Sequence, residues 1–408
     1  MKSVLVSHPL GNQVVRALIT RLLQHDALHS YYTTVNIPPQ APWLSLLPSK
    51  FRQELLRRSY EIPGRYIKSR SIRELVRQVS QRLGWHSLIL HESGWASIDA
   101  IYRDADKWVA SSLKKMELLP EVVYCYEDAA CDTFRVAGKL DIRRVYEITI
   151  GHYAAAQKIM KEEADSMPEF ASTIEALWDS EEKLKRKDEE IAQSDHIIAS
   201  SDFVRQTLLE SGVASDKISV VQYGSPDSLP AMPEKRNAAK DPLRLLFAGR
   251  IGQRKGIGYL LKAMQQLDRK DVELILMGEI VGNPEVYRPY EKLFRYQSPR
   301  PYNELLSMMQ SCDMLVLPTL FEGQALVILE AMRCGLPILT TPNSGATNLI
   351  QDQIEGFIVP IRSVDALVEK IQWAVDHRDL LYEMGQSARK RAEKCSWDNY
   401  AEVVASSL

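Results

Sequence analysis

Residues 243–263 read LRLLFAGRIGQRKGIGYLLKA, an apolar run, a short turn and then an amphipathic stretch. The first run is apolar without alternation, which is typical of a strand buried on both faces of a parallel sheet. Apolar residues then recur at the period of a helix, and this pattern predicts a helix from about Gly256. A strand that leads directly into a helix is the repeating unit of doubly wound α/β domains.

The same unit recurs along the rest of the chain. Downstream, the pattern predicts helices around Leu305 and from about Gly323, and strands at residues 272–278, 313–318 and 336–341. Upstream, each expected strand is followed by a helical pattern; these strands are residues 4–7, 87–90, 121–126, 143–150 and 195–200. We therefore predict an α/β fold with two doubly wound, Rossmann-like domains whose ligands bind at the carboxyl ends of the strands.

A proline-rich segment divides the two series of strands. Residues 226–242 hold four prolines among charged and small residues, a composition typical of interdomain linkers. We therefore expect an N-terminal domain over residues 1–225 and a C-terminal domain over residues 243–385. The charge-rich residues 158–190 are expected to form one or two solvated helices.

Composition narrows the class of protein. The chain has 408 residues, enough for two or three domains, with 45% apolar and 25% charged residues, as in soluble globular proteins. Its formal charge of −2 argues against nucleic acid as a main partner. Five scattered cysteines without CxxC spacing suggest neither disulfides nor a zinc site. Without a signal-peptide pattern or a membrane-spanning apolar run, we expect a cytoplasmic, enzyme-sized protein.

Two glutamates, Glu322 and Glu330, flank the expected start of the helix at about Gly323. The backbone N–H groups of residues 324–326 would be free in the first turn, and with the helix dipole they would form an anion site. An anion would repel a neighbouring carboxylate, so the two glutamates fit neutral hydroxyl partners such as those of a sugar and a ribose. The alternative is two ordinary glutamates on an exposed helix.

A basic pair lies at the junction between the strand and the helix of residues 243–263. Arg250 follows the strand and Lys255 precedes the helix, which is the combination of fixed charge and helix N–H donors that a diphosphate needs. Neither a Walker loop nor the G-x-G-x-x-G fingerprint is present. The alternative is a basic loop exposed to solvent.

Taken together, these features resemble the family 4 (group 1) retaining glycosyltransferases of the GT-B fold. The motifs that carry the resemblance are Gly249-Arg250, Lys255-Gly256, PTLFEG at residues 318–323, the Glu-x7-Glu spacing, and EAMRCGLP at residues 330–337. The resemblance is strong over residues 240–400 and weaker before them. It implies two domains that face a deep cleft, with residues 386–408 forming a helical segment that packs back on the N-terminal domain.

The resemblance also implies an activity, the transfer of a sugar from a nucleoside-diphosphate sugar to a hydroxyl acceptor with retention of configuration. Arg250 and Lys255 would hold the diphosphate and stabilise its charge as it leaves. Glu330 would accept hydrogen bonds from the ribose, and Glu322 would orient the donor sugar. The donor-binding set would be Gly249, Gly323, Gln324, Ala325, Leu326, Glu330 and Gly11. Two cations would replace a metal ion, so neither metal nor cofactor is expected.

The N-terminal half departs from the family pattern. Its first loop has a single glycine, Gly11, where the family often has a glycine-rich loop. The family often places a histidine that touches the donor sugar after the strand equivalent to residues 143–150. His152 is the candidate for that catalytic position, with a surface or helix-capping histidine as the alternative. Glu127 and Asp128, at the end of another expected strand, are candidates for binding acceptor hydroxyls.

A last feature concerns the place of the acceptor. Residues 42–48, PWLSLLP, precede a run from Lys50 to Arg82 with ten lysines or arginines and three acidic residues. An exposed tryptophan and leucine cluster beside a basic helix is typical of peripheral contact with an anionic membrane. This interpretation predicts a lipid-linked or membrane-anchored acceptor and shallow insertion of Trp43, Leu44, Leu46 and Leu47. The alternative is a Trp43 packed in the core.

The prediction is therefore a metal-independent, retaining glycosyltransferase in the cytoplasm, in contact with the inner face of the membrane. One alternative is a non-catalytic subunit that binds a sugar nucleotide within a glycosylation complex. Another is a different GT-B enzyme, such as an epimerase or a phosphorylase. The nucleotide base would be recognised largely by backbone near residues 278–283 and 295–301, so the sequence does not identify it.

Overall fold

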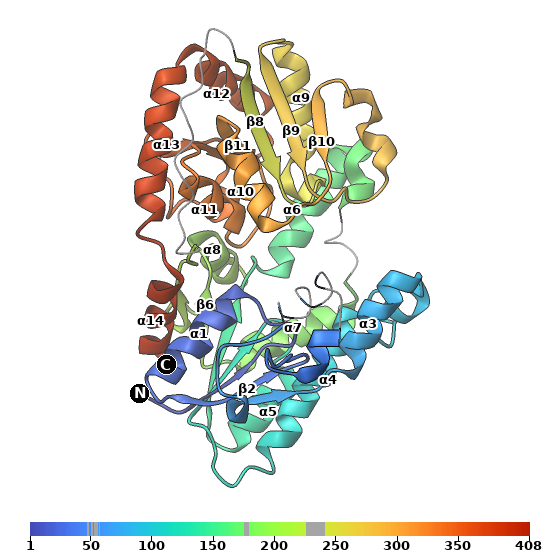
Figure 1. Ribbon diagram of the computed structural model, residues 1–408, viewed down its shortest axis with the longest axis vertical. Helices are drawn as coiled ribbons and strands as arrows, with labels where there is room; N and C mark the ends of the chain where they lie inside the picture. The colour runs from blue at the N-terminus through green and yellow to red at the C-terminus, as the bar shows by residue number, and fades with distance from the viewer. Residues whose placement is uncertain (47–48, 50–51, 53–55, 57, 175–178, 226–240) are drawn as a thin grey trace.

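The computed structural model describes residues 1–46, 49, 52, 56, 58–174, 179–225 and 241–408. Two parallel sheets form the centres of two halves that lie one above the other in Figure 1. The expected linker, residues 226–242, lies outside the described residues as far as residue 240. Among the described residues, no helix is both long and apolar enough to cross a membrane.

The N-terminal half is built on a seven-stranded sheet with the order β3-β2-β1-β4-β5-β6-β7. All of its neighbouring strands pair in parallel. Its strands are β1 (Val4–Ser7), β2 (Leu28–Thr33), β3 (Ile67–Ser69), β4 (Val122–Tyr126), β5 (Arg143–Ile148), β6 (His196–Ala199) and β7 (Ile218–Val220). Its helices are α1 (Gln13–Gln24), α3 (Ile72–Leu83), α4 (Ile98–Leu113), α5 (Cys131–Lys139), α6 (Tyr153–Ser166), α7 (Glu181–Gln193) and α8 (Asp202–Glu210).

The C-terminal half repeats this plan with six parallel strands in the order β10-β9-β8-β11-β12-β13. Its strands are β8 (Leu243–Ala248), β9 (Val272–Met277), β10 (Phe294–Gln297), β11 (Met314–Leu317), β12 (Ile338–Thr340) and β13 (Gly356–Ile358). The helices that follow are α9 (Ile257–Leu267), α10 (Tyr302–Gln310), α11 (Leu326–Arg333), α12 (Val364–Asp376), α13 (Arg378–Ala392) and α14 (Trp397–Ser407). The two-domain Rossmann-like fold is thereby confirmed.

The strand order reverses direction once in each sheet. The point of reversal determines where a ligand can bind. In the C-terminal sheet β8 lies between β9 and β11, so the helices after β8 and after β11 leave on opposite faces of the sheet. The crevice that opens at such a switch point, beyond the carboxyl ends of the strands, is the usual ligand site of doubly wound folds.

Two segments pack against the half of the molecule to which they do not belong in chain order. Ala156 and Met160 of α6 contribute to the hydrophobic core of the C-terminal half, and α6 lies between the halves in Figure 1. In the opposite direction, α14 packs against α1, where Tyr400 and Val404 join the core of the N-terminal half. The two halves are therefore joined by packing as well as by the chain.

Some local expectations were wrong. Residues 87–90 do not form a strand, because residues 86–89 form a 3-10 helix. The helix expected from about Gly323 begins at Leu326, so Glu330 lies about one turn into α11, whereas a start at Gly323 would have placed it about two turns along. The side chain of Leu44 is buried, so it does not insert into a membrane, and Leu47 lies outside the described residues.

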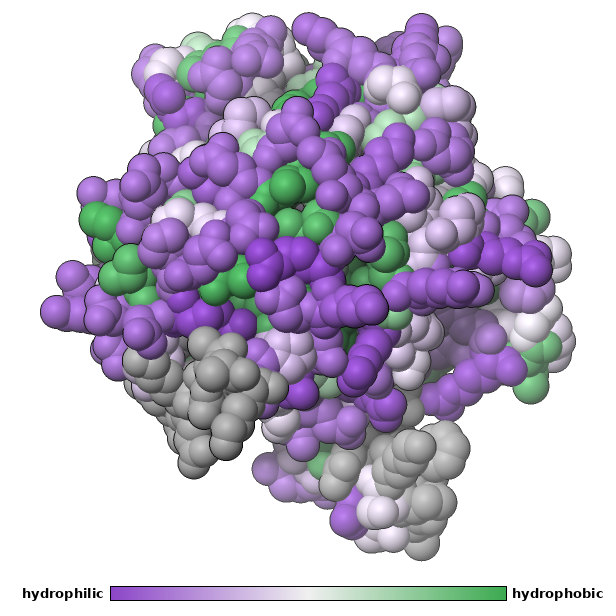
Figure 2. All heavy atoms as spheres, turned by 90° about the horizontal axis from the view of Figure 1, so that it is seen from above, coloured by the Kyte–Doolittle hydropathy of each residue, from purple (hydrophilic) through white to green (hydrophobic). Residues whose placement is uncertain are grey.

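The surface at the end of the C-terminal half is mostly hydrophilic. Seen from above, hydrophobic side chains on this face form small separate groups among polar ones (Figure 2). This view shows the ordinary surface of a globular protein, in which scattered apolar side chains need no special explanation.

Candidate active site

A cavity of about 440 Å³ lies at the carboxyl ends of β8 and β9. Its floor is formed by Ala248 and Gly249 after β8 and by Met277 and Gly278 after β9. The first turn of α11 and residues 299–300, which precede α10, complete the lining. The cavity thus lies at the switch point of the C-terminal sheet, where the fold leads us to expect a ligand.

Lys255 and Glu322 form the charged centre of this cavity. The Lys255 Nζ lies 2.6 Å from Glu322 Oε1, and Arg254 Nη1 lies 2.9 Å from the same oxygen. Burial opposes ionisation of this carboxyl, but the charges of Lys255 and Arg254 and their hydrogen bonds lower the pKa of Glu322 below its ordinary value. Glu322 is therefore an ionised partner that positions two cations, besides any contact with a sugar.

Arg254 is a residue that the sequence reasoning missed. Its guanidinium also donates to the carbonyl oxygen of Phe321, and its own carbonyl accepts from the amide of Leu320. These bonds connect the loop after β8 with the loop before α11. The adjacent basic residues Arg254 and Lys255 were the available signal, because both cations contact the same oxygen of Glu322.

Arg250 lies on the same loop but not in the lining of the cavity. Its side chain is about half exposed, and its Nε lies 3.7 Å from Glu279 Oε2. The structure therefore brings Lys255 together with Arg254 and does not bring it together with Arg250. A role for Arg250 at the diphosphate stays a prediction, which requires its flexible side chain to turn toward the cavity.

The loop that precedes α11 is fixed by contacts from several other segments. A Cβ at Gly323 would lie 1.7 Å from the carbonyl oxygen of Thr149, so the backbones approach too closely for any side chain. Ser201 Oγ donates to the Gly323 carbonyl at 2.6 Å, and Gln324 Oε1 accepts from the amide of Tyr223 at 2.7 Å. The loop before α11, residues 318–325, is therefore held in place by the N-terminal half.

The amide of Ala325 corrects one sequence expectation. It donates to the carbonyl of Ser344 at 3.1 Å and is not available to an anion. The remaining candidates for anion binding at this end of α11 are the amides of Gln324 and Leu326, both of which line the cavity. The side chain of Gln324, another residue of the lining, has a buried Nε2 with no hydrogen-bond acceptor among the described residues.

Glu330 is the most distinctive side chain of the site. It lines the main cavity and also a second cavity of about 330 Å³ whose walls include Gln13, Tyr302 and Trp397. Burial raises the pKa of Glu330 to about 7. Within the described ranges, its carboxylate has no hydrogen bond or ion pair. This half-buried carboxylate faces both cavities with its hydrogen-bonding capacity available, so it fits a ligand that brings hydroxyl groups.

The space beside Gly11, the N-terminal glycine predicted to approach the donor, is filled by the side chain of Tyr60. Gly11 has φ of +63°, and a Cβ there would lie 2.0 Å from the Tyr60 hydroxyl oxygen. Its amide donates to His8 Nδ1 at 2.9 Å. The close approach that requires glycine is therefore explained by Tyr60, and a donor contact at Gly11 stays a prediction.

His152 is the N-cap of α6 and lies near the loop before α11. Its Nδ1 accepts from the amide of Ala154 at 3.2 Å, which is the helix-capping alternative. Burial lowers the pKa of His152, so the ring is mainly neutral at pH 7. Two residues earlier, Ile150 forms an antiparallel bridge with Gly323. His152 thus lies beside the loop before α11 but does not line the cavity.

The two acidic candidates for acceptor binding are paired within the protein. Glu127 Oε1 lies 2.5 Å from Lys187 Nζ, and Asp128 Oδ2 lies 3.4 Å from the same nitrogen. Burial raises the pKa of Glu127, and the Lys187 charge opposes this. Both carboxylates connect the end of β4 to α7, and neither lines the cavity of about 440 Å³.

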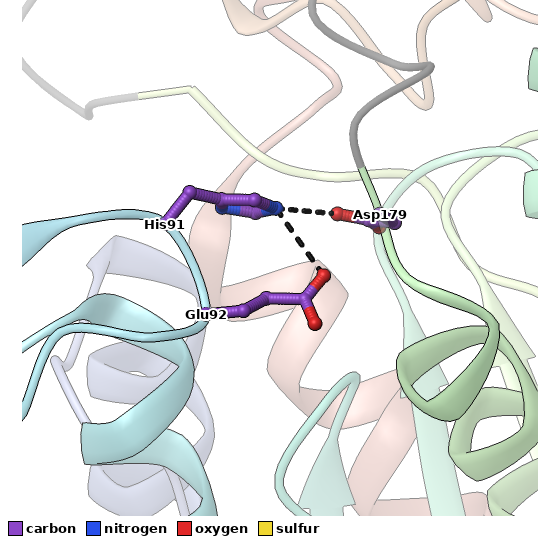
Figure 3. A group of neighbouring side chains, drawn as sticks. All are labelled: His91, Glu92 and Asp179. Carbon is purple, nitrogen blue, oxygen red and sulfur yellow. Dashed lines mark hydrogen bonds and ion pairs between the residues drawn. The ribbon is translucent and has the colours of Figure 1, made fainter.

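A second polar cluster joins the loop after residue 90 to the start of α7. Figure 3 shows His91 pointing toward Asp179, with Glu92 beside them; His91 Nε2 lies 3.1 Å from Asp179 Oδ1. The same Asp179 oxygen lies 2.8 Å from Lys183 Nζ, and Glu92 accepts hydrogen bonds from the amide and hydroxyl of Ser180. Because these acceptors already have donors, the cluster is best explained as an ion-paired connection.

The fold and the cavity define the class of the protein as a two-domain GT-B structure. Solved structures with this fold include sucrose-phosphate synthase from Thermosynechococcus elongatus, with a TM-score of 0.67 and 15% identity over 100% of this chain and 98% of that chain. HepE from Anabaena in complex with UDP-glucose has a TM-score of 0.62 and 14% identity, and each chain is covered completely.

The family resemblance is concentrated in the C-terminal half, where residues 230–391 match the family model "Glycosyl transferases group 1". A D-inositol 3-phosphate glycosyltransferase of Corynebacterium glutamicum is 28% identical over 47% of this chain and 51% of the relative. An uncharacterised glycosyltransferase of Methanocaldococcus jannaschii is 30% identical over 40% of this chain and 43% of the relative. The chain thus matches about half of the length of these curated relatives.

Proposed function

We propose that the protein is a glycosyltransferase that moves a sugar from a nucleoside-diphosphate sugar to a hydroxyl group of an acceptor. The observation that carries this proposal is the cavity at the switch point, which holds a paired lysine, a helix N-terminus and the carboxylate of Glu330, for which no described residue is a hydrogen-bond or ion-pair partner. A cation and helix amides suit a diphosphate, and a carboxylate suits ribose hydroxyls. The family match of residues 230–391 supports the same assignment.

In the proposed reaction the acceptor attacks the anomeric carbon on the face from which the diphosphate leaves. The bond between that carbon and the phosphate oxygen breaks, the new glycosidic bond forms, and the acceptor proton passes to the departing diphosphate. Lys255 and the amides of Gln324 and Leu326 stabilise the negative charge that develops. The transfer then retains anomeric configuration and proceeds without a metal ion.

The test is a panel of UDP-, GDP- and ADP-linked sugars in a thermal-shift assay, followed by product analysis with the donor that binds. A ligand at a hundredfold excess over its Kd stabilises the native state by about 2.7 kcal/mol, which is readily measured. Formation of an α- or β-linked product with the donor's configuration supports the proposal. Binding of a donor without hydrolysis or transfer would instead identify a sugar-nucleotide-binding subunit.

We expect Glu330→Ala to weaken donor binding by about 1.5 to 3 kcal/mol, because hydrogen bonds to a charged group are lost. Because burial raises the pKa of Glu330 to about 7, and hydroxyl donors favour the ionised form, affinity should rise as the pH increases through about 7. Calorimetric titration of the sugar nucleotide measures both effects. Glu369→Gln, an exposed glutamate on α12, is the control. Unchanged affinity and pH profile in a folded Glu330→Ala would exclude this role.

Activity is expected to survive an excess of chelator, because protein cations supply the positive charge at the leaving diphosphate. The measurement is turnover with EDTA present and after metal is added back. A complete loss that magnesium or manganese restores would assign the protein to a metal-dependent class of transferases.

We propose a hydroxyl-bearing acceptor that reaches the donor through the cleft between the halves, in the cytoplasm and at the inner face of a membrane. A lipid-linked acceptor follows from the basic run between Lys50 and Arg82, where the charge favours an anionic surface.

A further inference from the structure

Helix α3 is oriented with its apolar side toward solvent. Ile72, Leu75, Val79 and Leu83 recur at the spacing of one helix face, and their exposed fractions range from 43% to 68%. The opposite side carries Glu74, which is completely buried. An amphipathic helix of a globular protein normally does the reverse, so the exposed stripe requires an explanation.

The inverted orientation is maintained by a dedicated polar contact. Glu74 accepts two hydrogen bonds from Arg77, at 2.7 and 2.9 Å, and one from Gln78 at 2.9 Å. Arg58 lies 3.3 Å away. Burial opposes ionisation, but these partners lower the pKa of Glu74 below its ordinary value. Arg77 and Gln78 belong to α3 itself, whereas Arg58 lies outside it, so the Arg58–Glu74 ion pair is the contact that holds the polar side of the helix against the N-terminal half.

Two tryptophans extend the stripe into a larger surface. Trp85 follows α3 and Trp95 lies on the loop before α4, and both are about half exposed. In the described part of the chain, eight of the sixteen exposed large hydrophobic side chains lie within residues 72–98. We name this surface the α3 face and define it by Ile72, Leu75, Val79, Leu83, Trp85 and Trp95. It lies at the edge of the N-terminal half opposite α13 and α14 (Figure 1).

The exposed charged residues next to the α3 face in sequence are mainly positive. Lys68, Arg70 and Arg82 are exposed, and Arg73 lies over the ring of Trp95, 4.5 Å from its centroid. Three acidic residues of the same region are paired: Glu74 binds Arg77, Asp99 binds Lys183, and Asp104 lies near Arg70 and Arg73. Glu61 is exposed, so the cations still outnumber the exposed acidic side chains between residues 58 and 82. An approaching surface therefore meets apolar side chains flanked by cations.

We propose that the α3 face docks on the surface of an anionic lipid bilayer. Aliphatic side chains enter the boundary between headgroups and acyl chains, tryptophans lie at the interface, and the cations contact the headgroups. This surface differs from the tryptophan and leucine segment at residues 42–48, in which Leu44 is buried. It is separate from the donor cavity, so the inference rests on the membrane contact in the proposed function and not on sugar transfer, and vesicle binding and donor binding can fail independently.

The experiment is co-sedimentation of the full chain with vesicles of phosphatidylcholine alone or of phosphatidylcholine and phosphatidylglycerol in equal parts. The wild type is expected to bind the anionic vesicles at low salt and to be released at high salt, because counter-ions screen the attraction. The double variant Leu75→Glu, Val79→Glu should weaken this binding at least about tenfold, since it replaces apolar contact with like charge.

The matched control is Leu380→Glu, which places the same charge on a leucine of α13 that is 48% exposed. It should bind vesicles like the wild type, and circular dichroism and donor binding verify that all variants are folded. No binding to anionic vesicles at low salt would overturn the proposal, as would equal loss in the control. A light-scattering mass of a dimer that the double variant converts to monomer would assign the face to a second copy of the chain.

Discussion

Replacing Lys255 with alanine is expected to lower turnover about 10²- to 10³-fold, the effect of removing one group that stabilises charge in the transition state. The ammonium group lines the cavity and lies 2.6 Å from Glu322. The fold should survive, because Arg254 remains 2.9 Å from the same carboxylate. Initial rates at saturating donor measure the effect.

The control for this variant is Lys262→Ala, which removes a lysine of α9 that pairs with Glu169 outside the cavity. Its turnover should equal that of the wild type. If Lys255→Ala bound the donor and turned over at the wild-type rate, the assignment of Lys255 to the diphosphate would be wrong. If both variants lost activity equally, the effect would reflect general damage to the C-terminal half.

The second large effect is expected on stability, from Glu147→Ala. Glu147 is completely buried, and it accepts hydrogen bonds from the hydroxyls of Tyr124, Tyr223 and Tyr400 at 2.6, 3.2 and 2.8 Å. The substitution leaves three buried hydroxyls without their acceptor and creates a cavity, which together cost about 3 to 5 kcal/mol. Urea denaturation measures the free energy of unfolding, and Tyr400→Phe, which removes one bond, should cost about 1 kcal/mol.

The pH dependence of Glu147 provides the check on this interpretation. Burial raises the pKa of Glu147 to about 7 in the folded state, although the tyrosine hydroxyls oppose the shift. Since the unfolded chain loses this proton near its ordinary value, this group makes the protein less stable as the pH rises from about 4.5 to about 7. Glu147→Gln should lack that component relative to the wild type. An identical pH profile would contradict the assignment.

The strands and helices that form the fold could be predicted because their apolar patterns are local. Residues 243–263 form β8 and α9 as expected, and Lys255 and Glu330 lie at the cavity. The start of α11 could not be predicted, since it depends on Thr149, Ser201 and Ser344 contacts that no sequence pattern reports. The pairing of Glu322 with Arg254 was missed for the same reason.

The α3 face shows a different limit of sequence reasoning. Its period of apolar residues predicts a helix correctly, but the pattern alone implies that this stripe packs inward. The orientation is set by Glu74, whose partners Arg58 and Arg77 neutralise it inside the protein. Arg77 lies on α3 itself, so the ion pair with Arg58 is the contact that ties the polar side of the helix to the rest of the protein and leaves its apolar side exposed.

The pairing of charges around the donor cavity has a kinetic consequence. Lys255 and Arg254 contact Glu322, Arg300 lies 3.8 Å from Glu304, and Arg250 lies 3.7 Å from Glu279. The electrostatic potential outside the cavity is therefore weak, although each cation still attracts an anion strongly at contact distance. Under the proposed function, a sugar nucleotide would therefore arrive by ordinary diffusion with little long-range steering. Selectivity among anions would then depend on how well a bound ligand competes with Glu322 for Lys255.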